Sequence, residues 1–144
     1  MKLEDQKLLM KDLCARLPYG VKFKHKDWDV PLELTRIYKS VKHGTFIINE
    51  RIFEDDLNDF KPYLRSMSSM TKEERKDFIE CAGYEVEESQ NGRHYDYYLK
   101  DFCGTEDAPC ANADAIDWLN ENMFDYRGLI EKGLALAAPK GMYK

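Results

Sequence analysis

The first apolar pattern along the chain is that of an amphipathic helix over residues 3–17. Apolar positions recur at intervals of three and four residues, which predicts one buried face made of Leu3, Leu9, Met10, Leu13, Cys14 and Leu17. The charged residues between them, Asp12 and Arg16 included, are expected on the opposite, solvated face. Pro18 and Gly20 follow and predict the end of the helix.

A period of two replaces the helical period at residues 21–26, where Val, Lys, Phe, Lys, His and Lys alternate. A strand converts this order into two different faces, because successive side chains of a strand point to opposite sides of the sheet. Val21, Phe23 and His25 are therefore expected on an apolar face, with three lysines on the other.

Two further strands are predicted after a turn around Trp28. Branched and aromatic residues favour a strand over 32–38 and another over 45–49. The alternation breaks between Leu34 and Ile37, which indicates a bulge. Because the connections are short, the three strands are expected to form an antiparallel meander.

Residues 50–70 show no long period, so the sequence predicts a short helical turn followed by irregular chain. The acidic residues of this stretch lack the glycine and the terminal glutamate of a calcium loop. Thr71 and Glu74 then have the spacing of a capping box, which predicts the start of a helix. Phe78 and Ile79 are expected on its buried side.

Asn91 and Gly92 are the pair that a type I′ turn prefers, which predicts a β-hairpin around them. A further helix is predicted over 113–124, and the segment 133–144 is expected either to pack on the body of the protein or to form a flexible tail. The sequence thus predicts a single α+β domain, residues 1–144, in which a three-strand meander and a hairpin pack against about three helices.

Composition narrows the class of protein. With 43% hydrophobic and 12% aromatic residues, the 144-residue chain is not expected to be disordered. The longest apolar run, Leu134 to Pro139, is far shorter than the roughly 20 residues of a membrane span, so we expect no membrane segment, no signal peptide and a cytoplasmic location. The net charge is −5, but residues 1–49 carry +4 and residues 50–110 carry −8, which leaves room for a local basic face.

The residue types that carry chemistry form no recognisable pattern. Cys14 and Cys81 fall on apolar helix positions and are expected in the core, whereas Cys103 and Cys110 lie in a loop without the spacing of a zinc site. Phosphate-binding, nucleophile-elbow and metalloprotease motifs are absent from the sequence. We therefore expect no enzyme, no metal and no cofactor; the alternative is a hydrolase or transferase that uses His94 and Cys103.

Two surfaces are left as candidate binding sites. One is a lysine-rich strand face suited to backbone phosphates, made of Lys22, Lys24, Lys26, Arg36 and Lys39. The other is the C-terminal segment, whose apolar side chains fit the groove of a protein partner: Leu134, Leu136, Met142 and Tyr143. Each has a plainer alternative, namely a solvated sheet face that blocks unwanted strand pairing, and packing against the protein's own body.

Three segments carry a family resemblance: residues 1–20, 61–70 and 125–136. They resemble a family of short uncharacterised proteins found in gut Bacteroidales genomes and in the phage and mobile elements associated with them. The resemblance implies a setting but no activity, cofactor or catalytic residue. We therefore expect a small non-enzymatic cytoplasmic accessory protein that acts through protein–protein contacts with an unknown partner. The alternative is a phage-associated nucleic-acid-binding protein that uses the lysine-rich strand face.

Overall fold

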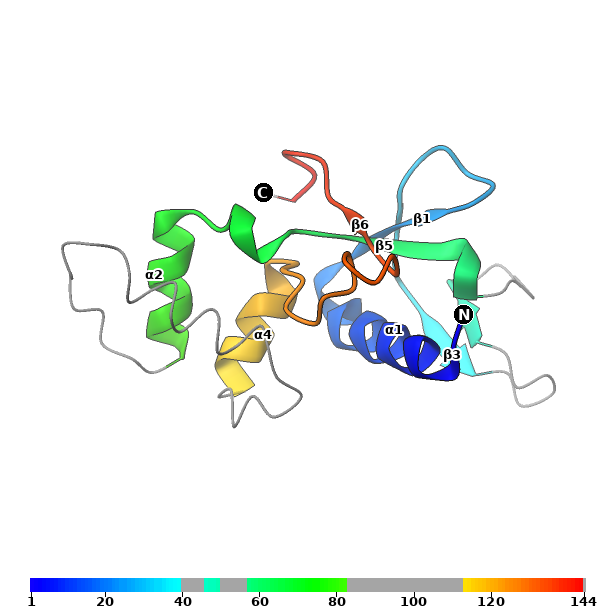
Figure 1. Ribbon diagram of the computed structural model, residues 1–144, viewed down its shortest axis with the longest axis horizontal. Coiled ribbons are helices and arrows are strands. Elements are labelled where there is room, and N and C mark those ends of the chain that lie inside the picture. Colours follow the sequence, from blue (N-terminus) through cyan, green and yellow to red (C-terminus); the bar gives the residue numbers. More distant parts are fainter. Residues whose placement is uncertain (40–45, 50–56, 83–112, 144) are drawn as a thin grey trace. The chain divides into compact units, whose positions relative to one another are not determined.

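Helices and β-strands both contribute to the structure, a computed structural model that describes residues 1–39, 46–49, 57–82 and 113–143 (Figure 1). The predicted α+β class is confirmed. The chain divides into two compact units, which are described separately. Unit 1 comprises residues 1–64 and 129–144, and unit 2 comprises residues 65–128. A compact unit is not by itself an independently folding domain, so the single domain stays a prediction.

Unit 1 begins with helix α1, Leu3–Arg16, followed by a 3₁₀ turn at Leu17–Tyr19 and by Gly20, whose φ of 70° is left-handed. The predicted helix is thus confirmed, and Leu9, Met10 and Leu13 are buried as predicted, but Leu3 is 67% exposed against the prediction. Asp12 and Arg16 are fully buried, and Cys14 is exposed. Asp12 and Arg16 lie four residues apart and form an ion pair at 2.8 Å, which allows this side of the helix to turn inward.

A four-stranded sheet packs in the same unit, in the order β2-β1-β5-β6. Its strands are β1 at Lys22–His25, β2 at Leu32–Glu33, β5 at Phe60–Leu64 and β6 at Leu136–Ala137. β1 runs antiparallel to both β2 and β5, and β6 runs parallel to β5. The C-terminal segment therefore completes the edge of a sheet that the N-terminal strands begin (Figure 1).

The predicted three-strand meander is wrong, because its second strand divides. β3, Ile37–Lys39, leaves the sheet and pairs with β4, Phe46–Ile48, in a separate antiparallel ladder. Asn49 explains the division: its side-chain oxygen accepts from the N–H of Thr35 at 2.8 Å, and its side-chain nitrogen donates to the carbonyl of Glu33 at 3.0 Å. These bonds use backbone groups at the predicted bulge.

The short helical turn predicted in this region is present at Leu57–Asp59. The prediction of irregular chain after it is wrong, because β5 forms there and pairs with a strand on each side. Pro62 argued against such a strand, since proline donates no ladder hydrogen bond. The carbonyl of Leu64 accepts from the N–H of Ala138 at 2.7 Å, so the backbone groups of Leu64 point away from β1. Residues two apart in a strand direct their backbone groups to the same side, so those of Pro62 also point away from β1. β6 pairs only with Tyr63 and Leu64, so proline costs no ladder bond.

Unit 2 contains helices α2, Lys72–Cys81, and α4, Ala113–Glu121. The capping box at Thr71 and Glu74 is present as predicted, and Arg65 makes a two-pronged ion pair with the same Glu74 carboxylate at 2.8 and 2.9 Å. The buried cluster between the helices consists of Met70, Phe78, Ile79, Ala115, Leu119 and Phe124. The last helix is shorter than predicted, because Met123 adopts a left-handed φ of 60°.

Several predicted features lie outside the described residues. These are the hairpin around Asn91 and Gly92, and the three chemistry-bearing residues His94, Cys103 and Cys110. Within the described residues, no helix has both the length and the apolar character that a membrane crossing requires.

Candidate functional site

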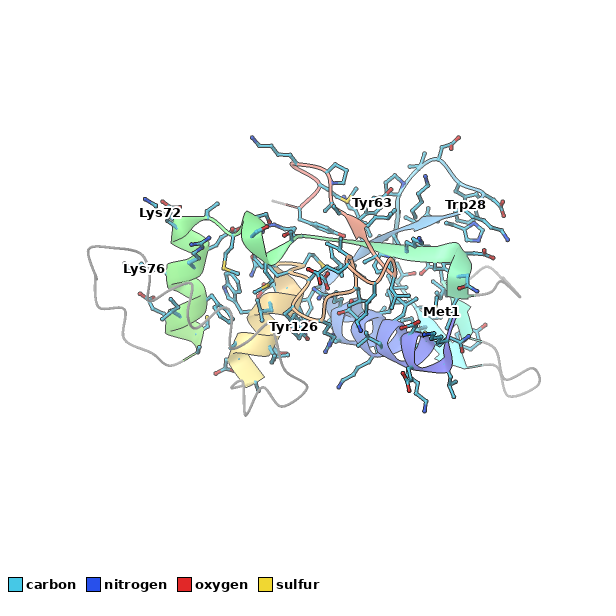
Figure 2. All side chains as sticks on the ribbon, in the orientation of Figure 1. Met1, Trp28, Tyr63, Lys72, Lys76 and Tyr126 are labelled. Atoms are coloured by element: carbon cyan, nitrogen blue, oxygen red, sulfur yellow. The ribbon has the colours of Figure 1, made fainter. Side chains whose placement is uncertain are left out.

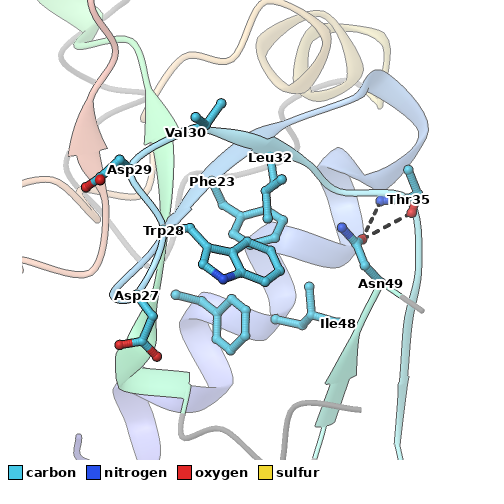
Figure 3. Close-up of a pocket in the computed structure, with 10 residues that line it drawn as sticks. Phe23, Asp27, Trp28, Asp29, Val30, Leu32, Thr35, Ile48 and Asn49 are labelled. Carbon is cyan, nitrogen blue, oxygen red and sulfur yellow. Dashed lines mark hydrogen bonds between the residues drawn. The ribbon is translucent and has the colours of Figure 1, made fainter. Parts of the chain in front are cut away.

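An open pocket of about 730 Å³ lies in unit 1, between the turn that joins β1 to β2 and strands β4 and β5 (Figure 3). We call it the Trp28 pocket. Its apolar lining is Phe23, Trp28, Val30, Leu32, Ile48 and Phe60. Its polar lining is Asp27, Asp29, Thr35 and Asn49. A volume in this range and a mainly apolar wall with few polar groups are typical of ligand-binding sites.

The floor of the pocket follows from the alternation that the sequence showed. Phe23 and His25 point to the buried side of β1, as predicted, while Phe60 comes from the neighbouring strand β5. The rings of Phe23 and Phe60 lie 5.5 Å apart at a tilt of 52°. Tilted aromatic pairs at this separation attract one another, so the floor is held in place by the sheet itself.

Buried His25 holds the turn that carries Trp28. Its Nδ1 accepts a hydrogen bond from the N–H of Asp27 at 3.2 Å, and its carbonyl accepts from the N–H of Trp28, also at 3.2 Å. The imidazole lies 5.4 Å from the Trp28 ring and 4.9 Å from the Phe60 ring. These hydrogen bonds and ring contacts hold the turn against the sheet.

The opposite wall is built by Ile48, which is buried, and by Asn49, whose φ of 59° is left-handed. Asparagine tolerates that conformation better than most residues. It lets the Asn49 amide face Thr35, whose hydroxyl donates to the same oxygen at 3.1 Å (Figure 3). The Thr35 N–H and hydroxyl on this wall are therefore both hydrogen-bonded to the Asn49 side chain.

Three exposed residues belong to the lining of the pocket, namely Asp27, Asp29 and Val30. Val30 is 69% exposed although it lines the pocket, and the Asp27 side chain is 66% exposed. Asp29 is also exposed, and Trp28 stands between the two aspartates in the chain. Figure 2 labels Trp28 on the loop that follows β1. Exposed valine beside a pocket is surface that a bound group would cover.

The residues of the predicted phosphate-binding face belong to more than one sheet of the structure. Lys22 and Lys24 of β1 alternate with Phe23 and lie on the opposite face. Lys26, which follows β1, is paired with Asp59 at 2.8 Å, and the Nζ of Lys22 lies 3.5 Å from the carbonyl oxygen of Met142. Lys24 is exposed. The two remaining residues follow the point where β2 ends: Arg36 is exposed, and Lys39 belongs to the separate β3–β4 ladder.

The C-terminal candidates lie against their own unit. Leu134 is buried, Leu136 lies in β6, and Met142 is half-buried. The Tyr143 hydroxyl accepts from the N–H of Lys22 at 2.8 Å and donates to the carbonyl of Tyr63 at 2.9 Å, so it bridges β1 and β5. Burial raises the pKa of Tyr143 to about 12. The structure therefore supports the alternative in which this segment packs on its own body.

Little in the described residues offers catalytic chemistry. Burial, with Asp77 nearby, raises the pKa of the half-buried Cys81, so its thiol stays protonated and is a weak nucleophile. Among the residues that the structure describes, no group of three or more histidines, cysteines and acids is placed to hold a metal ion. Sequence reasoning missed the Trp28 pocket, and its one signal was a tryptophan placed between two aspartates in a turn.

Comparison with protein-family models, with curated proteins and with solved structures found no match for this chain. The geometry of the Trp28 pocket therefore carries the functional argument.

Proposed function

We propose that the chain is a non-enzymatic accessory protein whose Trp28 pocket receives an apolar side chain of a protein partner. The observation that carries this proposal is the open pocket of about 730 Å³ with an aromatic floor and exposed Val30 at its mouth. Protein–protein interfaces gain most of their affinity from a few anchor side chains that are buried in such pockets.

The pocket is already formed, which favours binding. Phe23 and Phe60 are held by paired strands, and His25 fixes the turn that carries Trp28. A partner side chain the size of leucine or phenylalanine gains about 1.5–3 kcal/mol when its apolar surface leaves water. Because the walls need little reordering, little of that gain is lost to conformational entropy.

The nucleic-acid alternative has weaker support. Phosphate binding relies on several cations that face the ligand together. Lys26 is paired with Asp59 although 54% of its side chain is exposed, Lys22 is only half-exposed, and Lys24 is exposed. The resemblance to a family of short proteins found in gut Bacteroidales genomes and in their phage and mobile elements suits an accessory role in the cytoplasm and adds no residue to either proposal.

The test is a selection of binding peptides from a random display library, followed by affinity measurements with two variants. Val30→Glu places a charge at the mouth of the pocket, and the side chain it replaces is 69% exposed, so folding should be unaffected. Leu3→Glu is the matched control, because Leu3 is 67% exposed and lies on α1, away from the pocket lining.

We expect selected peptides to share one apolar anchor residue, to lose about tenfold or more in affinity for Val30→Glu, and to bind Leu3→Glu like the wild type. The tenfold estimate corresponds to about 1.4 kcal/mol, which is close to the smallest burial gain expected for one anchor. Equal affinity of the two variants for the selected peptides would contradict the proposal.

A further inference from the structure

The hydrogen-bond ladder between β1 and β5 has a side chain at one end. Within the ladder, the N–H of Lys26 donates to the carbonyl of Asp59 at 3.1 Å. Bonded pairs recur at every second residue of antiparallel strands, so the register makes Lys22 and Tyr63 the bonded pair four residues along each strand. The observed pairing of the two strands ends one residue before them.

The hydroxyl of Tyr143 occupies this place in the ladder. It accepts from the N–H of Lys22 at 2.8 Å and donates to the carbonyl of Tyr63 at 2.9 Å, and a regular ladder would join these two backbone groups directly. A hydroxyl can stand between them because it both donates and accepts. The C-terminal segment thus supplies the last link between β1 and β5, and we call residues 138–143 the C-terminal clasp.

An exposed turn joins the two attachment points of the clasp. At one end the N–H of Ala138 donates to a β5 carbonyl at 2.7 Å, and at the other end Tyr143 reaches the ladder. Between them the N–H of Met142 donates to the carbonyl of Pro139 at 3.1 Å, and Gly141 has a left-handed φ of 84°. Figure 1 shows that the chain reverses after β6. Release of the Tyr143 end therefore leaves the pairing of β6 in place.

The clasp holds the part of β1 that enters the Trp28 pocket. Phe23 follows Lys22 directly, and its ring lies 5.5 Å from that of Phe60 on the pocket floor. On the β2 side, the carbonyl of Val21 accepts from the N–H of Leu34 at 2.8 Å. The start of β1 thus has a hydrogen-bonded support on each side, and release of the clasp removes one of them. Local opening of this kind requires little free energy where few contacts break.

Resting on the proposed function, we propose that the C-terminal clasp regulates the Trp28 pocket. The attached clasp orders the start of β1 and, with it, the Phe23 side of the floor that a bound anchor contacts. A peptide in the pocket in turn keeps the clasp attached, because coupling between two sites is reciprocal. The coupling acts through local order and requires no large change of shape.

The experiment uses the full chain with Tyr143→Phe, which removes the hydroxyl and keeps the ring. The control is Tyr126→Phe in unit 2, which also removes a hydroxyl that donates a hydrogen bond, in this case to Asn120 at 3.1 Å. Affinity is measured by fluorescence anisotropy with the labelled peptide that the display selection yields. Amide hydrogen exchange, followed by NMR, reports the opening of β1 at Lys22.

We expect Tyr143→Phe to bind the peptide roughly fivefold more weakly than the wild type, at the lower end of typical coupling between sites, and Tyr126→Phe to bind it like the wild type. The Lys22 amide should exchange faster in Tyr143→Phe. In the wild type, saturation with the peptide should slow exchange at Lys22 by a similar factor, because the peptide favours the attached clasp. This last measurement needs no substitution, so it does not depend on the folding of a variant.

Three results would overturn the inference while Val30→Glu still weakens the peptide and the proposed function stands. The first is equal affinity of Tyr143→Phe and Tyr126→Phe for the peptide. The second is exchange at Lys22 that Tyr143→Phe leaves unchanged, and the third is exchange that the peptide does not slow. Each would mean that the start of β1 is equally ordered with the clasp attached or released. If Val30→Glu binds the peptide like the wild type, the proposed function itself fails.

Discussion

The buried ion pair of α1 gives the sharpest prediction about stability. Arg16→Met removes the guanidinium but keeps an apolar side chain of similar length in the same place. Asp12 then loses two hydrogen bonds, from Nε at 2.8 Å and from Nη2 at 3.1 Å, while it stays in a site where its exposure is 0%. A buried carboxylate without its partner is strongly unfavourable.

The expected loss is about 3–5 kcal/mol. Two hydrogen bonds to a charged group contribute about 1.5–3 kcal/mol each, and removal of one partner from a buried pair costs about 3–5 kcal/mol. The free energy of unfolding of a chain of this size falls by about 2 kcal/mol per molar urea, so this loss lowers the urea concentration at the unfolding midpoint by about 2 M. A chain of this length should also melt roughly 10–15 °C lower.

The assay is urea unfolding followed by circular dichroism on four proteins. Lys11→Met is the matched control, because Lys11 is exposed on the same helix, and it should stay within about 0.5 kcal/mol of the wild type. Asp12→Leu combined with Arg16→Met should recover most of the stability, since an apolar pair of similar volume often replaces a buried ion pair without loss.

A loss of less than about 1 kcal/mol for Arg16→Met, close to that of Lys11→Met, would refute the reasoning. It would mean that the side chains of Asp12 and Arg16 meet water in solution.

Two further predictions concern pH. The pKa of folded Tyr143 is about 12 against an ordinary value of 10, so its hydroxyl stabilises the fold below pH 10 and this stabilisation is lost between pH 10 and 12. Tyr143→Phe should lower the free energy of unfolding by about 1–3 kcal/mol at pH 8. In urea titrations it should also lose less stability than the wild type between pH 10 and 12. An equal loss of stability in the two proteins would count against the bridge between Lys22 and Tyr63. In unit 2, the hydrogen bond from Arg65 is the main reason that the pKa of Glu74 lies below its ordinary value of 4.5. The ion pair therefore stabilises the folded state above pH 4.5, and this stabilisation is lost as the pH falls through the pKa of the folded state. Arg65→Gln should raise the Glu74 pKa in a carbon-13 NMR titration, and an unchanged value would exclude Arg65 as the cause.

Local patterns predicted local structure well. The leucine spacing of α1, the capping box at Thr71 and the alternation through Phe23 each depend on neighbouring residues alone, and each is confirmed. The prediction of the α1 faces held at its central leucines and failed at Asp12 and Arg16, because a buried Asp–Arg pair has the same sequence signature as two solvated charges. Asp12 and Arg16 differ from surface charges only through what packs around them.

Features that depend on distant residues were missed. β5 lies between β1 and β6, and β6 comes from the far end of the chain, so no local signal places Pro62 in a central strand. The Trp28 pocket likewise combines the turn after β1 with Ile48 and Phe60, which lie 20 and 32 positions beyond Trp28 in the sequence. Turn chemistry around Asp27 and Asp29 predicted a turn, and only the fold shows that its tryptophan lines a cavity.

The most direct test of the account locates a bound peptide on the protein. The measurement is a set of intermolecular nuclear Overhauser effects on isotope-labelled wild-type protein saturated with the selected unlabelled peptide. The account predicts contacts from the anchor residue of the peptide to the Trp28 indole, the Phe60 ring and the Ile48 methyl groups. Contacts confined to α1, to the lysine face of β1 or to unit 2 would contradict it.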